Sequence, residues 1–238
     1  MARDGTTVRQ RLAIWGAGGH ALVVADIIRL RDEYEFVGFV DDVHPQRHET
    51  RFFGAPLFTG DAPLPRLRDL AVTHLIFGFG DCEVRLSLGE AVRAAGFTLA
   101  TAIHPRAVVA ADVPVGAGTV IAAGTIVNPG STVGENVNLA PSVSVDHQCQ
   151  IEDGAHLSPG VHLSSKVSVG RAAWLGIGAI VNDRVRVGAG ALVGAGALVL
   201  DDVPEHVLCY GSPARVVRAL TGGAFEEIRQ ARGKRYGP

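Results

Sequence analysis

The sequence predicts a small parallel, Rossmann-like α/β domain followed by an all-β parallel helix of six-residue repeats. Three observations predict it. Residues 11–100 alternate strand-like and helix-like patterns, and residues from 107 onward follow a period of six. The 238-residue chain also has 30 Gly against nine Phe, three Tyr and two Trp, so Val, Ile, Leu and Ala must fill its core. We expect domains at 1–105 and 106–217, and a tail at 218–238.

The first part contains four short apolar runs that we interpret as strands: "RLAIW", "EFVGFV", "THLIFGF" and "FTLA". Between them, "HALVVADIIRLRDEY" and "CEVRLSLGEAVRAAG" have the spacing of helices. Such alternation is typical of a parallel α/β layer. The intervening stretch, residues 43–70, is rich in Pro and Gly, and we expect a loop with a short hairpin there.

The second part carries a branched aliphatic residue at every sixth position. The sixteen residues of this series are Val109, Val115, Ile121, Val127, Val133, Leu139, Val145, Ile151, Leu157, Leu163, Val169, Leu175, Val181, Val187, Val193 and Val199. Two residues before each of them stands a small or short side chain, and Gly, Ala, Ser or Asn often follows. A β-sandwich that was rich in Val and Gly by coincidence would not keep this register, so a β-helix is favoured.

The geometry of the repeat follows from its period. Three hexads close one triangular coil of eighteen residues, and successive coils stack at the interstrand spacing of about 4.8 Å. The sixteen hexads therefore form roughly five coils. We expect the aliphatic residues to point into the coil, and Gly or Asn to stand at corners that need positive φ.

Composition argues against several classes of function. The formal charge is −2 and no basic block is present, so nucleic acid is not an expected partner. No apolar run approaches the ~20 residues of a membrane span, and the polar start predicts no signal peptide, so we expect a cytoplasmic protein. Cys82, Cys149 and Cys209 are widely spaced without a C-x-x-C, which argues against a disulfide framework or a cysteine zinc site.

Four stretches carry a resemblance to a known family: "IWGAGGHALVVADII", "GFVDD", "GFGDCEVR" and "VDHQC". With the hexads, they resemble the left-handed β-helix acyltransferases, in the branch that acetylates sialic acids and nucleotide-linked amino-sugars. The resemblance covers about residues 11–218. It implies the left hand of the helix, acetyl-CoA as co-substrate without a metal, and homotrimers whose active sites lie between neighbouring subunits.

Three histidines, His147, His156 and His162, stand in one glycine-spaced stretch. His156 is nine residues beyond His147, half a coil away, so the two cannot share a site within one subunit but could do so across a trimer interface. The resemblance makes His147 the general base and His156 a group from the neighbouring subunit that contacts the acetyl group or the sugar. Imidazole suits the first role because it accepts protons near neutrality. We expect His162 to be structural, although His147 could also be a plain exposed corner residue.

Two further residues belong to the expected catalytic group. Gln148 stands where relatives carry an acidic residue after the base; its amide can still hydrogen-bond imidazole but favours imidazolium less, unless Asp146 compensates. Ser165 lies eighteen residues after His147, so its backbone N–H could stabilise the thioester oxyanion, as the resemblance suggests. Cys149 permits a covalent Cys–His reading, but its place in the hexad favours simple packing.

The resemblance also indicates where acetyl-CoA binds. Small residues would admit the pantetheine arm along a groove between two β-helices, and "YGSPARVV" resembles the family's closing motif. The expected cofactor-binding residues are Gly176, Ala179, Gly194, Ala197 and Arg215.

The stretch "GAGGHA" follows a predicted strand and opens a predicted helix, as in dinucleotide-binding folds. An NAD site is the alternative, but some 90 residues make only about half of such a fold. We prefer a nucleotide-sugar site with the pyrophosphate at the helix N-terminus. Its expected residues are Gly16, Gly18, Gly19, His20, Asp41, Asp42, Gly80 and Asp81, with Asp41 or Asp42 bonded to the base or ribose.

Together these features predict an acetyl-CoA-dependent N-acetyltransferase for a nucleotide-linked amino-sugar of a surface polysaccharide. O-acetylation of a sialic acid or similar sugar is the enzymatic alternative. A non-catalytic β-helix is the alternative of another class: a scaffold, or a metal protein like the γ-class carbonic anhydrases. The histidine spacings of nine and six do not match the close ligand pair of that class.

Overall fold

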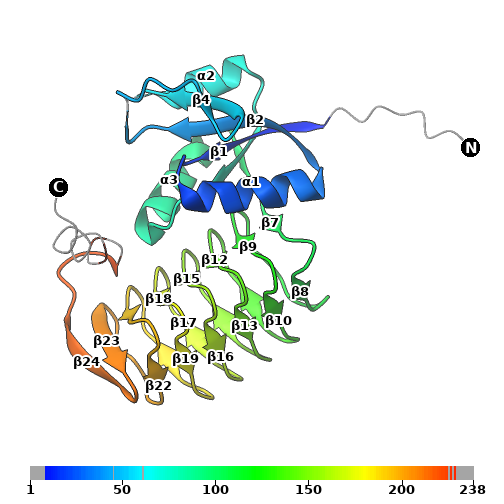
Figure 1. Ribbon diagram of the computed structural model, residues 1–238. Coiled ribbons are helices and arrows are strands. Elements are labelled where there is room, and N and C mark those ends of the chain that lie inside the picture. The colour runs from blue at the N-terminus through cyan, green and yellow to red at the C-terminus, as the bar shows by residue number, and fades with distance from the viewer. Residues whose placement is uncertain (1–8, 45, 61, 225, 227, 229–238) are drawn as a thin grey trace, which may run out of the picture. The chain divides into compact units, whose positions relative to one another are not determined.

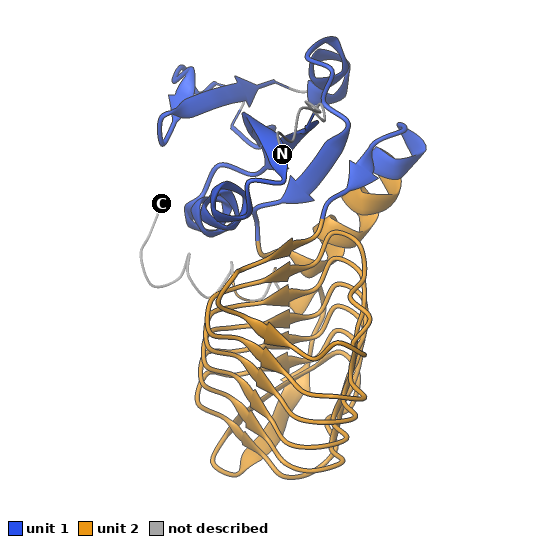
Figure 2. Ribbon diagram, turned by 90° about the vertical axis from the view of Figure 1, so that its right-hand side faces the viewer, with its two compact units in different colours: residues 1–79, 92–100 blue, residues 80–91, 101–238 orange. Residues whose placement is uncertain are grey.

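The computed structural model describes residues 9–44, 46–60, 62–224, 226 and 228. The chain divides into two compact units, residues 1–79 with 92–100 and residues 80–91 with 101–238 (Figure 2). This division lies near the expected boundary at residue 105 but assigns residues 80–91 to the second unit. Most of the expected tail, residues 225, 227 and 229–238, lies outside the described residues.

The first unit is a six-stranded sheet with strand order β3-β4-β2-β1-β5-β6. All its neighbouring pairs are parallel except the β3–β4 hairpin, which confirms the expected parallel layer and hairpin. The strands are β1 (Gln10–Trp15), β2 (Tyr34–Asp41), β3 (Arg51–Phe52), β4 (Ala55–Thr59), β5 (His74–Phe77) and β6 (Thr98–Leu99). The helices are α1 (Gly19–Arg31), α2 (Pro63–Asp69) and α3 (Cys82–Ala94), of which the last straddles the two units.

The centre of this sheet is buried and tightly packed. Leu12, Ala13 and Ile14 of β1 are completely buried, and α1 contacts β1 and β2. Gly78 permits the close packing, because a Cβ there would lie 2.7 Å from the Cα of Ala21. The chain leaves β1 toward β2 on one side while β5 lies on the other, so the loop after β1 opens at a topological switch point, where α/β folds bind ligands. Within the described residues, no helix is long and apolar enough to cross a membrane.

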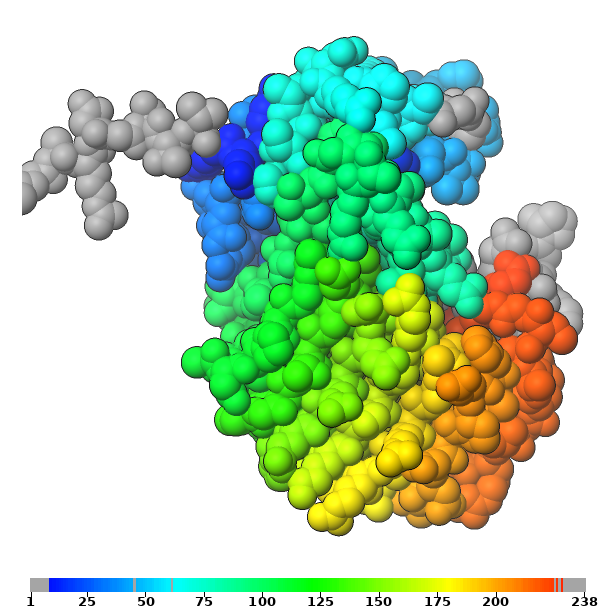
Figure 3. Space-filling view, turned by 180° about the vertical axis from the view of Figure 1, so that it is seen from behind, coloured from blue at the N-terminus to red at the C-terminus, as the bar shows by residue number. Residues whose placement is uncertain are grey.

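The second unit contains a left-handed parallel β-helix of stacked triangular coils, seen in Figure 1 as rows of short arrows and in Figure 3 as diagonal bands. Paired residues are eighteen apart, as Ser144 and His162 show. One sheet contains β8 (Val108–Val109), β10 (Ile126–Val127), β13 (Ser144–Val145), β16 (His162–Leu163), β19 (Ile180–Val181) and β22 (Leu198–Val199). The next contains β11 (Thr132–Val133), β14 (Gln150–Ile151), β17 (Ser168–Val169) and β20 (Arg186–Val187).

The third sheet closes each coil and the end of the helix. It contains β7 (Ala102–Ile103), β9 (Val120–Ile121), β12 (Asn138–Leu139), β15 (His156–Leu157), β18 (Trp174–Leu175), β21 (Leu192–Val193), β23 (Val207–Gly211) and β24 (Ala214–Ala219). All neighbouring pairs are parallel except β23–β24, an antiparallel hairpin after the last coil. The helix therefore ends where the family-like "YGSPARVV" stretch turns back on itself.

The hexad series forms the core, as expected. Every member from Ile121 to Val199 is buried in one cluster, and Val109 and Val115 pack partly buried against it. The small residues two positions earlier also face inward, and where they are polar they bond to the next coil. The hydroxyl of Thr119, for example, donates to the Gly134 carbonyl at 2.7 Å and accepts from the Val137 N–H at 3.0 Å. The buried hydroxyl of Thr119 is thus satisfied by the next coil.

Arg85 explains why residues 80–91 group with the β-helix. Its buried guanidinium donates to the carbonyl oxygens of Gly80 at 2.5 Å, Gly154 at 2.8 Å and Asn136 at 3.1 Å. Asp81 begins α3 by accepting from the Val84 N–H at 3.0 Å. The start of α3 is therefore tied to two successive coil corners.

The coils contain two kinds of glycine. Gly178 has φ +67° and open space around a Cβ, and Ser142, two coils earlier in the same column, adopts φ 62°. Gly170 has an ordinary φ, but a Cβ there would lie 2.6 Å from the Ala189 backbone nitrogen. Only the second kind is required by the distance between coils.

We therefore expect Gly170→Ala to destabilise the protein more than Gly178→Ser. The first change forces the backbone of two coils apart, at a cost of about 3 kcal/mol. The second places a residue in a left-handed conformation that this helix already tolerates, at a cost of about 1 kcal/mol. Urea unfolding of both variants checks this order, and equal effects would show that coil spacing does not select these glycines.

Candidate functional site

His147 lies at the corner after β13, and the neighbouring coils hold this corner in place. The Asp146 carboxylate accepts from the Asn128 amide at 3.0 Å and from the His147 N–H at 2.8 Å. These hydrogen bonds, from Asn128 first and from the His147 backbone second, hold the pKa of Asp146 below its usual value. Gln148 adopts φ 60° and its N–H donates to the Pro129 carbonyl at 3.1 Å. The backbone that carries the imidazole is therefore fixed.

The same corner is also held from inside the coil. The buried Ser131 hydroxyl donates to the Asp146 carbonyl at 2.8 Å and accepts from the Cys149 N–H at 3.0 Å. The Cys149 thiol is buried in the core cluster and lies 3.1 Å from the Ser164 carbonyl oxygen, and burial raises its pKa. The interpretation of Cys149 as a packing residue is confirmed, because a buried thiol of raised pKa is a poor nucleophile.

The imidazole of His147 is exposed to solvent. Its Nδ1 lies 3.3 Å from the Gln148 side-chain oxygen, which can only accept a hydrogen bond. This contact assigns the proton of the neutral ring to Nδ1 and leaves a lone pair on Nε2. Asp146 contacts the backbone N–H of His147 and the side-chain amide of Asn128 rather than this ring nitrogen, so Gln148 orients the ring.

Ser165 lies one coil beyond His147. The strand pairing of β13 with β16 and the 3.0 Å bond from the Lys166 N–H to the His147 carbonyl place the two corners side by side. The Ser165 hydroxyl bonds to the Asp183 carboxylate. Among the described residues, none accepts a hydrogen bond from the Ser165 N–H. This backbone donor therefore remains available beside the imidazole.

The other two histidines of the stretch lie in different sheets. His156 on β15 is buried, stacks on Trp174 with ring centroids 3.8 Å apart, and contacts the Asn138 amide at 3.1 Å. His162 on β16 is exposed and bonds to the Ser144 hydroxyl at 2.7 Å. Within the described part of the chain, no three His, Cys, Asp or Glu side chains are grouped closely enough to hold a metal ion.

The expected coenzyme residues differ in accessibility. Ala179 and Ala197 are buried in the core cluster of the coil, so we correct their assignment: a molecule outside the helix does not reach them. Gly176 and Gly194 are partly exposed, but a Cβ on Gly176 would lie 2.6 Å from the Ala195 backbone nitrogen, and one on Gly194 would lie 2.6 Å from the Tyr210 Cβ. Coil stacking therefore explains both glycines without a ligand.

Arg215 on β24 is the expected coenzyme residue whose side chain is most open to solvent. Its side chain is 67% exposed, with contacts to the Ala214 carbonyl at 2.9 Å and to Asp201 at 3.7 Å. A guanidinium so exposed is free to reorient toward a phosphate. Its assignment to the coenzyme stays a prediction.

In the first unit, the glycine-rich turn joins β1 to the N-terminus of α1. Gly16 has φ +121° and a Cβ there would lie 2.9 Å from the Gly78 carbonyl oxygen, whereas Gly18 and Gly19 have open space around them. Gly18 is the N-cap of α1, and no side chain caps it. His20 stands in the first turn of the helix. The turn thus leaves room and amide donors for an anion at the helix start.

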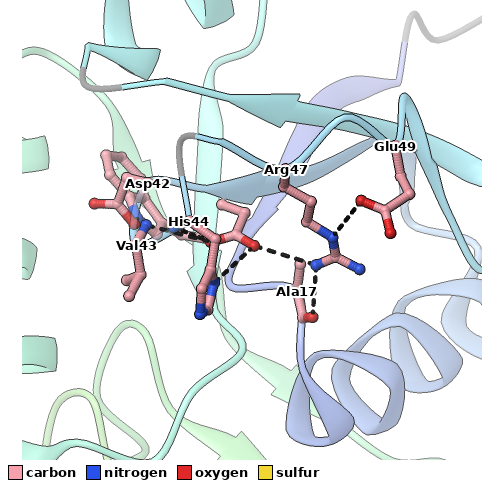
Figure 4. A network of polar contacts seen from close by, with 8 residues as sticks. Ala17, Asp42, Val43, His44, Arg47 and Glu49 are labelled. Atoms are coloured by element: carbon pink, nitrogen blue, oxygen red, sulfur yellow. Dashed lines mark hydrogen bonds and ion pairs between the residues drawn. The ribbon is translucent and has the colours of Figure 1, made fainter.

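Asp41 corrects the prediction that either aspartate is free for a base or ribose. It is buried and accepts from the backbone N–H and the ring of His44, both at 3.1 Å, and from Arg47 at 3.1 Å (Figure 4). Burial alone would raise its pKa, but the hydrogen bonds from Arg47 and His44 outweigh burial and lower the pKa. Asp42 is partly exposed and accepts from the Trp15 indole at 2.9 Å, which leaves its other oxygen available.

Sequence reasoning missed His44 and Arg47, which lie in the segment expected to be loop. Arg47 also donates to the Ala17 carbonyl at 3.4 Å and lies over the Phe52 ring at 5.2 Å, so it joins this segment to the glycine-rich turn. His44, Gln46 and Arg47 line an open pocket of about 320 Å³. The sequence could have indicated these two residues, because a histidine and an arginine closely follow the two aspartates.

Gly80 and Asp81, the last two expected substrate residues, belong to the second unit. The Gly80 carbonyl is engaged by Arg85, and Asp81 caps α3 through the Val84 N–H. Both residues thus have structural tasks, and their contact with a substrate stays a prediction.

Comparison with known proteins gives matches to both units. Residues 11–92 match the PglD N-terminal domain family. UDP-N-acetylbacillosamine N-acetyltransferase of Bacillus subtilis is 33% identical over 113 residues, a match that spans 47% of this chain and only 50% of that enzyme.

Two solved structures match almost throughout. PerB from Caulobacter crescentus, in complex with CoA and GDP-perosamine, is 37% identical with a TM-score of 0.81, covering 87% of this chain and 97% of PerB. The acetyltransferase domain of PglB from Neisseria gonorrhoeae, in complex with acetyl coenzyme A, is 32% identical with a TM-score of 0.81, covering 88% of this chain and 100% of that domain.

The agreement in fold and sequence over nearly the full length of these acetyltransferases bears out the resemblance first seen in the hexads and the "VDHQC" corner. The chain belongs to the hexapeptide-repeat acetyltransferases, in the branch of the nucleotide-linked amino-sugar N-acetyltransferases.

Proposed function

We propose that this chain transfers the acetyl group of acetyl-CoA to the amino group of a nucleotide-linked amino-sugar, with His147 as general base. One observation carries the proposal: the exposed imidazole of His147 lies one coil from the backbone N–H of Ser165, and among the described residues neither its Nε2 nor that N–H has a hydrogen-bond partner. The kinship with PerB and with the Bacillus enzyme supports an amine as the acceptor.

His147 supplies the proton chemistry. A sugar ammonium has no lone pair for attack on a thioester until it loses a proton, and neutral imidazole accepts protons near pH 7. Gln148 keeps the ring proton on Nδ1, so Nε2 faces the acceptor as a base. The proton taken from the amine can then pass to the departing thiolate, which balances the reaction without another acid.

Ser165 supplies electrostatic stabilisation through its backbone. When the amine attacks, negative charge develops on the thioester oxygen, and a fixed N–H donor lowers the energy of that state. Its hydroxyl is engaged by Asp183, so the side chain needs no catalytic part. The neighbouring Lys166 N–H, bonded to the His147 carbonyl, keeps the two corners in register.

We assign the two co-substrates to different units of the chain. Acetyl-CoA would lie along the helix surface past Gly176 and Gly194, with Arg215 near a phosphate. The nucleotide diphosphate would lie at the start of α1, where the uncapped turn of Gly16, Gly18 and Gly19 offers amide donors. Asp42 is the better candidate for the base or ribose, since Asp41 is already engaged.

A homotrimer would complete the site. His147 and His156 belong to corners and strands on different faces of one chain, so a shared site needs a second copy. Val108 on β8 and Ile126 on β10 are exposed apolar neighbours in the first sheet of the β-helix, the kind of surface that subunit contacts cover. We place the reaction in the cytoplasm, with a surface polysaccharide as the destination of the sugar.

The proposal predicts amine-dependent release of CoA thiol. Acetyl-CoA is incubated with UDP-, GDP- and dTDP-linked 3- and 4-amino-sugars, and thiol release is followed together with the product mass. One acceptor should give an amide, and His147→Ala should lower its kcat at least about a hundredfold, the usual worth of a positioned general base. Gln150→Ala, an exposed change three residues away, is the matched control and should keep activity.

Three results would contradict this proposal. Amide formation undiminished in His147→Ala would remove the base, and an ester with the matched hydroxyl sugar but no amide would move the acceptor class to O-acetylation. If no acceptor reacts although acetyl-CoA binds, the nucleotide-sugar assignment fails.

Gln148→Glu should change the pH dependence of the reaction. A carboxylate beside imidazole favours the protonated ring, so the ring cannot act as a base until a higher pH is reached. We expect the acidic limb of the kcat/KM profile to move upward by about half a unit to one unit, because the pair is exposed and screened. Rates measured from pH 5 to 9 check this shift.

Salt provides the control for that experiment. The upward shift should shrink in about 1 M salt, where the Debye length is only about 3 Å. If the acidic limb of the kcat/KM profile does not move in Gln148→Glu, the side chain at position 148 does not interact with the general base.

A further inference from the structure

Inward hydroxyl and thiol groups join successive coils of the β-helix. Each belongs to the small residue two positions before a hexad aliphatic, and each donates to the carbonyl fifteen residues further along the chain. The pairs include Thr119 with Gly134 at 2.7 Å, Thr125 with Ala140 at 3.1 Å, Ser131 with Asp146 at 2.8 Å and Cys149 with Ser164 at 3.1 Å. A carbonyl oxygen can only accept, so the side chain supplies the proton in every pair.

The last two of these donors lie in one column of the coil. Ser131 and Cys149 are eighteen residues apart, at corresponding positions of paired strands. The neighbouring coils carry valines at this position, Val113 before them and Val167 and Val185 after them. A valine side chain cannot donate a hydrogen bond. From Val113 to Val185, this column therefore supplies side-chain donors in two successive coils and in no other.

These two donors hold the two peptides of the candidate site. The Ser131 hydroxyl bonds to the carbonyl of the Asp146–His147 peptide, and the Cys149 thiol bonds to the carbonyl of the Ser164–Ser165 peptide. The first peptide leads to the proposed general base. The second carries the N–H that we assign to the oxyanion.

The thiol bond determines which way the Ser165 N–H points. The Ser164–Ser165 bond is a trans peptide, so its C=O and N–H point in opposite directions. The carbonyl faces the sulfur of Cys149, a residue that is completely buried, so the N–H faces away from the interior of the coil. Among the described residues, this thiol is the one hydrogen-bond donor to the Ser164 carbonyl.

The backbone bonds on either side do not fix this peptide plane by themselves. The Ser164 N–H donates to the Val181 carbonyl, and the Ser165 carbonyl accepts from the Arg184 N–H, both at 3.0 Å. These bonds anchor the two neighbouring peptides. The plane between them can still tilt through opposite changes in ψ of Ser164 and φ of Ser165, the two soft dihedrals that flank it. The thiol bond opposes this tilt.

We propose that Cys149 is a positioning residue whose thiol holds the Ser164 carbonyl inward, so that the Ser165 N–H is aimed at the thioester oxygen. This role is additional to the packing of Cys149 in the core. The inference rests on the proposed function, since it assumes that this N–H stabilises the oxyanion. A donor lowers the barrier only when it points to where charge develops, so a tilt of the peptide slows the reaction more than it weakens binding.

Kinetics of substituted enzymes test the positioning. Cys149→Val removes the thiol but keeps the core filled, with the residue that neighbouring coils carry in the same column. We expect kcat to fall about tenfold and the KM for acetyl-CoA to stay within about twofold, because the lost alignment concerns the transition state. The acidic limb of the kcat/KM profile should stay in place, since His147 is untouched. Cys149→Ser restores a donor like that of Ser131 and should keep kcat within about threefold.

Cys209→Val is the matched control. Cys209 is buried in the same core cluster, and the structure gives its thiol no hydrogen bond within the described part of the chain. The substitution should leave kcat within about twofold. Urea unfolding shows whether each variant is folded. If Cys149→Val does not fold, Cys149→Ala removes the same donor, and the same fall in kcat is expected.

Infrared spectroscopy tests the bond itself without turnover. The S–H stretch of a thiol that donates a hydrogen bond lies at lower frequency than that of a free thiol. Subtracting the spectrum of Cys149→Ser from that of the unchanged protein isolates the band of Cys149, and Cys209→Ser isolates that of Cys209. We expect a bonded thiol at position 149 and a free thiol at position 209.

Unchanged kcat in Cys149→Val would overturn the proposal, and so would an equal loss of kcat in Cys149→Ser. A free-thiol band at position 149 would overturn it as well. Failure of the proposed function looks different: the Cys149 band would be that of a bonded thiol while no amino-sugar is acetylated.

Discussion

Parallel pairing between residues eighteen apart is the constraint on which the second unit depends. It brings every hexad aliphatic over the one from the preceding coil, and it brings backbone donors over backbone acceptors at each corner. The core and the candidate site follow from the same register. A shift of one residue would turn the aliphatic series outward and would separate His147 from Ser165.

This constraint explains how a repetitive scaffold can perform chemistry. The groups around His147 do not depend on long flexible loops: Asn128, Ser131 and Pro129 belong to the preceding coil and hold the corner from outside and inside. The same regularity keeps His147 and His156 on separate faces, because half a coil lies between them. A single chain therefore presents these two imidazoles on different faces, so the proposed shared site needs a second copy of the chain.

The periodic part of this structure was predictable, and the particular contacts were not. A strict period of six predicts which side chains face inward, so the core and the packing role of Cys149 could be predicted from the sequence. It does not distinguish a glycine near a ligand from one required by the next coil, which is why Ala179 and Ala197 were misassigned. In the first unit, the engagement of Asp41 by His44 and Arg47 arises in a segment without periodicity, so only the folded chain reveals it. The stack of His156 on Trp174 follows the eighteen-residue spacing that the period of six implies, but the spacing alone does not show that the two rings touch.

Mixed oligomers test most directly whether His147 of one subunit and His156 of another form one site. His147→Ala and His156→Gln chains, each expected to have little activity alone, are co-expressed in equal amounts and the assembled protein is assayed. If each site takes one histidine from either subunit of a pair, random assembly restores about a quarter of the sites, and activity should return to about that fraction of wild type. Mixed oligomers that stay as inactive as the parents would contradict the account, because both histidines would then serve within one chain.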